Sequence, residues 1–447
     1  MSNSELLGDD CMPEYNTEYN AENNMQYVIN ELTGVCMLPA CGEDSLNIES
    51  VRQICDTLQN LEWVGIGTTW FVNSTDIANI EVISPGAERS ANEKSDSWAV
   101  GNYDRDNAYK IHRENDGDPS TVRYGGTTSD RNLISYIDAF RANCKKIAFY
   151  PFFAVDNENK DWRGLIKGDS SFLNAFYEKY KPFVMHYANL LKDRVDIFYL
   201  GSELEGLTSI KAEGRDFPFV DCLIDLASSV KTVLGAKVEI SYAANWSEYH
   251  SCEGGYRPLD KLWSNENIGF VGIDYYMPLT NTKSSDISLA EIKQGFTSGE
   301  GRDYYKLDDC QISFDSKDAQ WKNIEYWYGS EHWAWDAEKE ESYKTSWVPS
   351  SKRIIFSEFG FPSVDKATNN PHEYDAYPDY STGETNFSLQ IEAIRATIEY
   401  ISESDFIRQG FCYGWDSRGS GWQEKFGDGN KWEKGHWIDG KLKKRLI

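Results

Sequence analysis

Short apolar runs that alternate with amphipathic stretches make up most of the chain. Over residues 48–71, Val51, Ile54 and Leu58 lie at helical spacing before an apolar run from Trp63 to Phe71, which predicts a helix followed by a buried strand. Seven later runs predict further strands: "TVRYGG", "KKIAFYPFFAVD", "VDIFYLGSE", "KVEISYAANW", "IGFVGIDYYMPL", "KRIIFSEFGFPS" and "RQGFCYGWDS". Helices are predicted at about residues 130–143, 170–191, 218–234 and 388–401.

Eight buried strands that alternate with helices indicate a parallel sheet covered on both faces, and eight such strands close a (β/α)8 TIM barrel. A doubly wound open sheet is the structural alternative. No glycine-rich phosphate fingerprint follows the Trp63 strand, which favours the barrel.

Two long polar stretches read as βα-loop insertions, at residues 73–120 and between the sixth and seventh strands. The second contains "WKNIEYWYGSEHWAWD", an aromatic segment suited to roofing a cleft. Residues 1–45 are polar and lack a clear period, so we expect a tail or the remnant of an upstream domain there. The TIM-barrel domain is then expected over residues 46–447.

Composition excludes several classes of protein. The chain has 72 Asp plus Glu against 45 Lys plus Arg, for a net charge of −27, which disfavours a nucleic acid or an anionic membrane as partner. The amino terminus lacks the basic and apolar regions of a signal peptide, and no stretch approaches the roughly 18 apolar residues of a membrane helix. We therefore expect synthesis in the cytoplasm without membrane insertion.

Cysteines and histidines give no metal or cofactor signature. The 9 cysteines are odd in number and scattered, which fits a reducing compartment better than a disulfide scaffold. Cys36 and Cys41 are the nearest pair, but no second pair follows at zinc-ligand spacing. No HExxH motif, GxSxG motif or phosphate-binding loop is present. The sequence therefore predicts neither a metal nor a cofactor.

In such barrels the active site is built at the carboxyl ends of the strands. Carboxylates, aromatic residues and one amide dominate the predicted strand ends: Trp70, Tyr150, Glu203, Glu205, Asn245, Trp246, Asp274, Tyr276, Glu358, Trp415 and Asp416.

Glutamates end the fourth and seventh predicted strands, so that they face each other across one mouth. A glycosidase needs such a pair, one carboxyl to protonate the leaving oxygen and one carboxylate to attack the anomeric carbon. Most glutamates are simply exposed loop residues, and for Glu358 alone that interpretation is equally good. Glu203 and Glu205 lie on the same strand face if the strand continues, so spacing alone leaves both open as the partner of Glu358.

The other strand-end residues also have two interpretations. Trp415 is a core residue or a platform for a sugar ring, and Tyr276 is a buried tyrosine or a donor to Glu358. Asp274 and Asp416 bind sugar hydroxyls or pair with an arginine such as Arg418.

Several ordered motifs identify a family. "YGGTTSD", "FYPFFAVD" followed by "DWRG", "YLGSELEGLTSI", "ISYAANWSEYH", "PLDKLWSNENIGFVGIDYYMPLTN", "SEFGFPSVDKATNNP" and "KWEKGHWIDGKL" resemble the TIM-barrel-like domain of gene transfer agent and phage tail proteins, over about residues 48–442. This glycoside hydrolase-like domain is related to retaining glycosidases with glutamates at strands four and seven.

The resemblance assigns roles that spacing left open. It implies that Glu203 is the acid/base, Glu358 the nucleophile, Tyr276 the residue that steadies it, and Trp415 the sugar platform. Ser202 stands where the related glycosidases have an asparagine that contacts the substrate, which puts efficient hydrolysis in doubt.

The resemblance also implies a context. Similar proteins carry the domain within a longer tail or baseplate polypeptide, so this chain is expected to be a split gene product or a remnant, assembled with other tail proteins. A bacterial cell-wall or surface glycan is the expected substrate.

Three functions follow. The first is a retaining glycoside hydrolase of a phage, prophage or gene transfer agent tail. The second is a structural or glycan-binding tail module that has lost turnover. The third is a metal-dependent hydrolase that uses Asp274 and Asp416.

Overall fold

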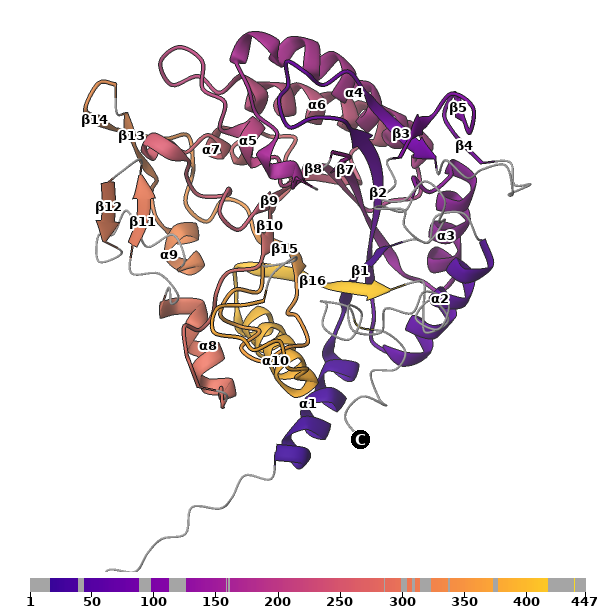
Figure 1. The fold of residues 1–447 in the computed structure, drawn as a ribbon, viewed down its shortest axis with the longest axis vertical. Helices are drawn as coiled ribbons and strands as arrows, with labels where there is room; N and C mark the ends of the chain where they lie inside the picture. The colour runs from indigo at the N-terminus through magenta and orange to yellow at the C-terminus, as the bar shows by residue number, and fades with distance from the viewer. Residues whose placement is uncertain are drawn as a thin grey trace, which may run out of the picture.

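A computed structural model of the protein describes residues 17–38, 44–87, 98–111, 126–157, 159, 161–284, 286–298, 304–307, 310–313, 323–336, 338–372, 377–416 and 438. Eight parallel strands close into a barrel, and helices surround it (Figure 1). In chain order these strands are β1 (Gly34–Leu38), β2 (Trp63–Val72), β7 (Lys146–Val155), β8 (Ile197–Ser202), β9 (Glu239–Asn245), β10 (Val271–Tyr275), β15 (Ile354–Phe359) and β16 (Ile407–Asp416). The predicted (β/α)8 TIM barrel is confirmed.

The barrel begins earlier in the chain than predicted. Strand β1 pairs with β2 on one side and with β16 on the other, so it closes the barrel. Residues 34–38 therefore belong to the barrel and not to the polar segment predicted over residues 1–45, because this strand pairs with two neighbours and its residues 34–37 are buried. Placing the second strand at residues 121–126 is also wrong for the barrel, because β2 pairs directly with β7. One strand was missed before the Trp63 strand and one was placed wrongly after it, so the numbering of the later strands is unchanged. Strands β8 and β15 are the fourth and seventh strands of the barrel, as predicted.

Helices follow or precede most strands on the outside of the barrel. They are α1 (Thr17–Glu31), α2 (Asp44–Thr57), α3 (Asp130–Ala142), α4 (Leu173–Leu190), α6 (Pro218–Leu234), α7 (Leu259–Trp263), α8 (Leu289–Ser298) and α10 (Phe387–Glu403). Local capping sets several starts: Ser129 accepts from the Asn132 N–H at α3, and Asn386 accepts from the Leu389 N–H at α10. Predicted helices at 130–143, 170–191, 218–234 and 388–401 correspond to α3, α4, α6 and α10.

Helix α1 precedes β1 and lies beside α10 (Figure 1). The Arg395 guanidinium of α10 lies 5.0 Å from the centre of the Tyr27 ring and also donates to Asn24. Residues 17–31 are thus part of the outer layer of the barrel.

Aromatic rings fill the barrel interior where glycines leave room. Tyr150 stacks on Tyr199 with ring centres 4.3 Å apart. A Cβ atom on Gly65 would lie 2.8 Å from the Tyr150 ring, and one on Gly67 would lie 2.1 Å from the Phe152 ring. These two glycines of β2 therefore admit the large residues of β7. The interior layer forms the floor beneath the carboxyl ends of the strands.

The long loops carry small elements of their own. The loop after β2 contains β3 (Ile83–Ala87), β4 (Ala99–Val100), β5 (Tyr103–Asp104) and β6 (Tyr109–Lys110), and the loop after β7 contains η3 (Arg163–Leu165) and η4 (Ser170–Phe172). After β8 and β9 come α5 (Glu205–Thr208) and η5 (Glu253–Gly255). The insertion before β15 contains β11 (Tyr304–Leu307), β12 (Cys310–Ser313), α9 (Ile324–Gly329), β13 (Trp333–Asp336) and β14 (Glu341–Lys344).

The predicted aromatic insertion packs on neighbouring loops. Arg215, between α5 and α6, pairs with Asp336 at 2.8 Å, and Arg257, just after η5, donates to the Trp333 carbonyl at 3.0 Å. Within the described residues, no contact joins β13 or β14 to Glu203 or Glu358, so roofing of the mouth stays a prediction.

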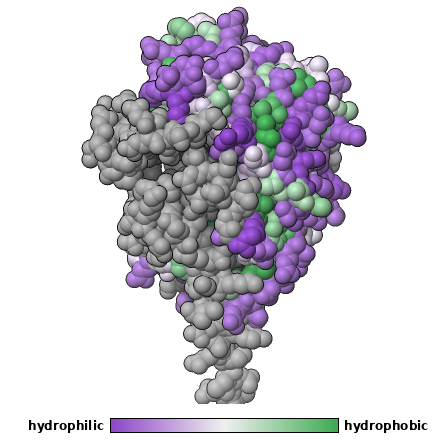
Figure 2. Space-filling model, turned by 90° about the vertical axis from the view of Figure 1, so that its right-hand side faces the viewer, coloured by the Kyte–Doolittle hydropathy of each residue, from purple (hydrophilic) through white to green (hydrophobic). Residues whose placement is uncertain are grey.

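The visible surface is mainly polar, and the described cysteines are unpaired. Figure 2 shows a face on which hydrophilic residues predominate and hydrophobic ones are scattered between them. Six cysteines in the described ranges, at positions 36, 55, 144, 222, 252 and 412, are free thiols. Among the described helices, none is long and apolar enough to cross a membrane.

Candidate active site

Two buried glutamates lie at the same end of the barrel. Glu203 directly follows β8, and Glu358 is the fifth of the six residues of β15. They are 7% and 6% exposed. Glu203 has a φ of 51°, which is uncommon for a residue with a side chain, and its N–H donates to the Ala243 carbonyl of β9 at 2.8 Å. A left-handed residue costs about 1–2 kcal/mol, so the surrounding contacts must hold Glu203 in place.

Three donors surround the carboxyl of Glu203. Arg163 Nη2 lies 2.8 Å from Oε2, Trp162 Nε1 donates to the same oxygen at 2.9 Å, and Asn245 Nδ2 donates to Oε1 at 2.7 Å. Arg163 also donates from Nε to the Ser202 carbonyl at 2.9 Å and from Nη2 to Ser202 Oγ at 3.0 Å. The end of β8 is thereby tied to the loop after β7.

Glu358 has a different environment. Its Oε2 accepts a hydrogen bond from the Tyr276 hydroxyl at 2.8 Å. Burial, followed by the negative charge of Glu203, raises the pKa of Glu358 to about 7, against the opposing effects of Arg163 and the Tyr276 hydrogen bond. The charge of Glu203 thus acts on the titration of Glu358.

Asp274 lies beneath the two glutamates and is fully buried. Its Oδ2 accepts from Ser202 Oγ at 2.9 Å and its Oδ1 from Ser357 Oγ at 2.7 Å, so one carboxyl joins the residues that precede Glu203 and Glu358. Burial, then the charges of Glu358 and Glu203, raises its pKa well above the usual range. Both oxygens of Asp274 are occupied by serine hydroxyls and have no exposed surface, so its contact with a sugar hydroxyl stays a prediction. The arginine pairing is not tested, because Arg418 lies outside the described residues.

Glu205 has no direct contact with the carboxyl of Glu203 but is linked to it through Ser247 and Asn245. It begins α5, and its Oε2 accepts from Ser247 Oγ at 2.8 Å. Burial raises the pKa of Glu205, opposed by the Ser247 hydrogen bond, and the charge of Glu203 raises it further. Only Glu203 of the pair meets Arg163 and Trp162, which separates two residues that strand spacing had left equivalent.

The fifth strand contributes an amide and an aromatic ring. Asn245 binds Glu203, and its own backbone N–H donates to Glu248 Oε2 at 3.0 Å. Trp246 is 8% exposed, with its ring centre 5.0 Å from that of His372. Asn245 thus lies at the cluster, and Trp246 lies in contact with the loop after β15.

Two predicted contact residues point elsewhere. Trp70 packs on Phe183 of α4 and donates to the Tyr187 hydroxyl at 2.8 Å, so it lies in the outer core. Tyr150 is 1% exposed in the barrel interior, where its hydroxyl donates to the Ser357 carbonyl at 2.8 Å. Trp70 faces the outer helices because strand side chains alternate between the two faces, whereas Tyr150 faces the interior five residues before β7 ends. Neither side chain lies with Glu203 and Glu358 at the strand ends.

Trp415 and Asp416 end β16, and the side chain is described only for Trp415. Trp415 is fully buried, and within the described part of the chain its indole N–H has no hydrogen-bond partner. The ring of Trp415 is thus part of the core in this structure, and its role as a sugar platform stays a prediction. The side chain of Asp416 lies outside the described residues.

Sequence reasoning missed Trp162 and Arg163 as site residues. They lie in the segment "DWRG", residues 161–164, which is outside the predicted strands. The Arg163 guanidinium also lies 4.9 Å from the centre of the Phe152 ring. A tryptophan and an arginine together in the loop after the third strand were the available signal, since such loops lie at the barrel mouth.

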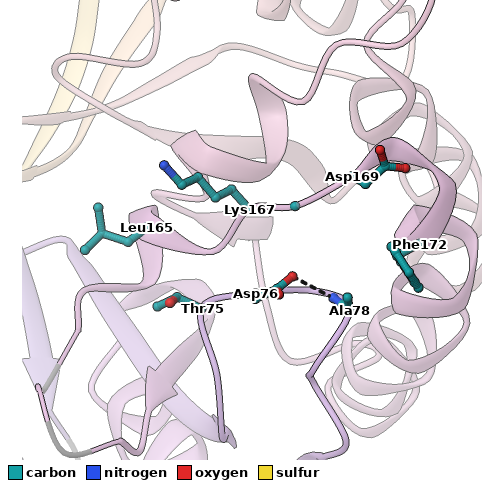
Figure 3. Close-up of a pocket in the computed structure, with 8 residues that line it drawn as sticks. Thr75, Asp76, Ala78, Leu165, Lys167, Asp169 and Phe172 are labelled. Carbon is teal, nitrogen blue, oxygen red and sulfur yellow. Dashed lines mark hydrogen bonds between the residues drawn. The ribbon is translucent and has the colours of Figure 1, made fainter.

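An open surface hollow of about 420 Å³ lies outside the cluster, between the loops after β2 and β7 (Figure 3). Leu165 and Phe172 lie on opposite sides of it in that view, and Asp76 accepts from the Ala78 N–H at 3.0 Å. None of the contacts described for Glu203 or Glu358 involves its lining residues. Among the described residues, no group of three or more His, Cys, Asp or Glu side chains could hold a metal ion.

Comparison with known proteins agrees with the barrel. The model of the GTA TIM-barrel-like domain family matches residues 178–415. No curated protein matches the chain. A complex of a GH113 β-1,4-mannanase is similar in structure, with a TM-score of 0.54 and 13% identity, covering 92% of this chain and 94% of that one. A GH113 β-mannanase from Alicyclobacillus acidocaldarius has a TM-score of 0.52 and 13% identity over 92% and 94% of the two chains. At this identity the likeness shows the fold alone.

Proposed function

This chain belongs to the GTA TIM-barrel-like domain family, as its motifs predicted, and we propose that its barrel mouth hydrolyses an O-glycosidic bond with retention of anomeric configuration. The observation that carries the proposal is the pair of buried glutamates at the ends of β8 and β15, which are coupled electrostatically. Glu358 receives the Tyr276 hydroxyl, an arrangement suited to a nucleophile held in one orientation.

The proposed chemistry has two steps. Glu358 attacks the anomeric carbon through one carboxylate oxygen, while Glu203 gives a proton to the leaving oxygen. This breaks the glycosidic bond and forms a glycosyl ester with Glu358. Glu203, now a carboxylate, takes a proton from water, and the resulting hydroxide displaces Glu358 from the sugar. Tyr276 holds Oε2 of Glu358, which leaves Oε1 for the attack.

A bacterial cell-wall or surface glycan is the proposed substrate class. Family membership supports it, because a domain that works within a tail or baseplate, among other tail proteins, meets the cell envelope first. The solved mannanases make β-1,4-mannan a second polymer worth testing.

The experiment is reducing-sugar release from purified peptidoglycan, β-1,4-mannan and a polysaccharide panel. We expect release by the wild type and a loss of about 10²–10⁴-fold in Glu203→Gln and Glu358→Gln. Glu213→Gln, in an exposed loop, is the matched control and should keep full activity. Proton NMR of the first-formed sugar then gives its anomeric configuration. No release by the wild type from any polymer would refute hydrolysis, and an inverted product would refute retention.

A glycan-binding module without turnover is the second candidate. Ser202 in place of asparagine favours it, as does the occupation of Glu203 by three protein donors. Calorimetry with soluble peptidoglycan fragments and manno-oligosaccharides distinguishes the two. Binding by the wild type and by both Gln variants, without release by any of them, would support this module over the enzyme.

A further inference from the structure

The buried cluster at the mouth contains three carboxyls but one guanidinium. Glu203, Glu358 and Asp274 are each less than a tenth exposed, and the side chain of Arg163 is 18% exposed. Burial penalises every uncompensated charge, so three neighbouring carboxylates cannot all stay ionised beside one cation. The cluster therefore retains at least one proton near neutral pH, and the hydrogen bonds indicate where.

Every partner of Glu203 is a donor that cannot accept. The guanidinium of Arg163, the indole N–H of Trp162 and the amide NH₂ of Asn245 all point hydrogens at its two oxygens, within 2.9 Å. A proton on Glu203 would weaken all three hydrogen bonds and leave the Arg163 charge without its partner. These contacts favour the carboxylate.

The partners of the other two carboxyls are hydroxyls. Tyr276 contacts Glu358, and Ser202 and Ser357 contact Asp274. A hydroxyl can accept as well as donate, so these positions tolerate a proton on the carboxyl. Ser202 is the exception, because its oxygen already accepts from Arg163 and its hydrogen is directed to Asp274. Burial raises the pKa of both Glu358 and Asp274, in the same direction as the geometry.

We propose that Arg163 is a positioning residue that, with Trp162 and Asn245, keeps Glu203 ionised in the ligand-free protein, so that the protons of the cluster lie on Glu358 and Asp274. This is the reverse of the charge distribution that the proposed hydrolysis requires, in which Glu203 is the acid and Glu358 the carboxylate. The catalytic consequence rests on the proposed function. Ligand binding must draw Arg163 from Glu203, and one proton must then leave Glu358 and arrive on Glu203, with no net change in charge.

The test is a ¹³C NMR titration of the full chain labelled at glutamate Cδ, with signals assigned from Glu203→Gln and Glu358→Gln. We expect the Glu203 signal to stay at its carboxylate position from pH 5.5 to 8, while Glu358 titrates near pH 7. In Glu203→Gln the Glu358 midpoint should fall, because a neighbouring negative charge is lost. In Arg163→Met it should rise, because a neighbouring positive charge is lost. Arg408→Met is the control, since Arg408 pairs with Glu239 at the other end of the strands and should leave both signals unchanged.

A protonated Glu203 in the wild type at pH 6 would overturn the proposal, as would a Glu358 midpoint that does not change in Glu203→Gln. The wild-type titration decides the matter even where Arg163→Met fails to fold. Because the titration needs no turnover, an inactive protein with this proton distribution refutes only the proposed hydrolysis. Hydrolysis by a protein whose Glu203 is protonated at rest refutes only the present inference.

Discussion

Glu248 is a buried carboxyl that supports the strand end carrying Asn245. Its Oε2 accepts from the Asn245 N–H at 3.0 Å, and its Oε1 contacts the hydroxyls of Thr208 at 2.6 Å and Tyr242 at 2.8 Å. Burial raises its pKa from 4.5 to about 8, since the side chain is 4% exposed. Thr208 also lies 3.2 Å from the Glu205 carbonyl, so it can pass its hydrogen there and accept one from a neutral Glu248.

The raised pKa has a consequence for stability. The folded protein holds this proton more tightly than the unfolded chain, so the contribution of Glu248 is fully present below pH 4.5 and is lost as the pH rises to about 8. With pKa values of 4.5 in the unfolded chain and about 8 in the folded protein, the contribution of Glu248 to the free energy of unfolding falls by about 3 to 4 kcal/mol between pH 5 and pH 8. The wild type should lose that much free energy of unfolding through this one group.

Glu248→Gln isolates the effect. The amide is neutral at every pH, and it leaves one of the surrounding donors without an acceptor, at a cost of about 1–3 kcal/mol that does not depend on pH. All other titrating groups are shared by the two proteins and cancel in the difference. The stability of the wild type relative to Glu248→Gln should therefore fall by about 3 to 4 kcal/mol from pH 5 to pH 8.

The assay is equilibrium urea unfolding followed by tryptophan fluorescence at pH 5, 6, 7 and 8. Glu331→Gln, which removes an exposed carboxylate paired with Lys344, is the control. A difference between wild type and Glu248→Gln that stays constant to within about 0.5 kcal/mol would refute the reasoning. It would mean that the three donors hold Glu248 ionised in the folded protein.

Three further predictions concern the nucleophile, the interior and the first strand. Tyr276→Phe removes the hydrogen bond that lowers the pKa of Glu358, so we expect that pKa to rise above about 7 in a ¹³C titration, and an unchanged midpoint would contradict the assigned contact. Gly65→Ala places a Cβ 2.8 Å from the Tyr150 ring and should lower the free energy of unfolding by about 1–3 kcal/mol in urea. Gly329→Ala, whose Cβ would point into open space, should change the free energy of unfolding little, and equal effects of the two substitutions would argue against a tight interior. A chain that starts at residue 45 loses β1, so it should be insoluble or lack the native circular dichroism spectrum. A chain that starts at residue 17 keeps β1 and should fold. A folded product from residue 45 would show that β1 is dispensable.

Strands buried on both faces are easy to recognise in a sequence, which explains why most of the barrel strands could be predicted. Strands β7 to β10, β15 and β16 appear as continuous apolar runs, because every residue of such a strand faces either the interior or a helix. Their order then placed Glu203 and Glu358 at the ends of the fourth and seventh strands. Strand β1 was not predicted because it is only five residues long and follows a polar helix. Its burial comes from its neighbours β2 and β16, which are distant in the chain or separated by a helix.

The direction of individual side chains needed the tertiary structure. Trp70 and Tyr150 both lie near strand ends, yet one faces the outer helices and the other the barrel interior, because barrel curvature and strand register decide the face. A tryptophan at position 415 is consistent with a core residue and with an exposed sugar platform, and only the packing of the folded chain shows that it is buried.

Residue types and their order along the chain determined that two glutamates share one barrel mouth. Which partners each glutamate meets depended on the conformation of the loop after β7, whose course no periodic pattern records. That loop brings Arg163 and Trp162 to Glu203 from 40 and 41 positions away in the chain, and so decides the charge of the site. Local sequence determines a strand and its end, whereas the balance of burial and charge that sets a proton's position exists only once distant segments are packed together.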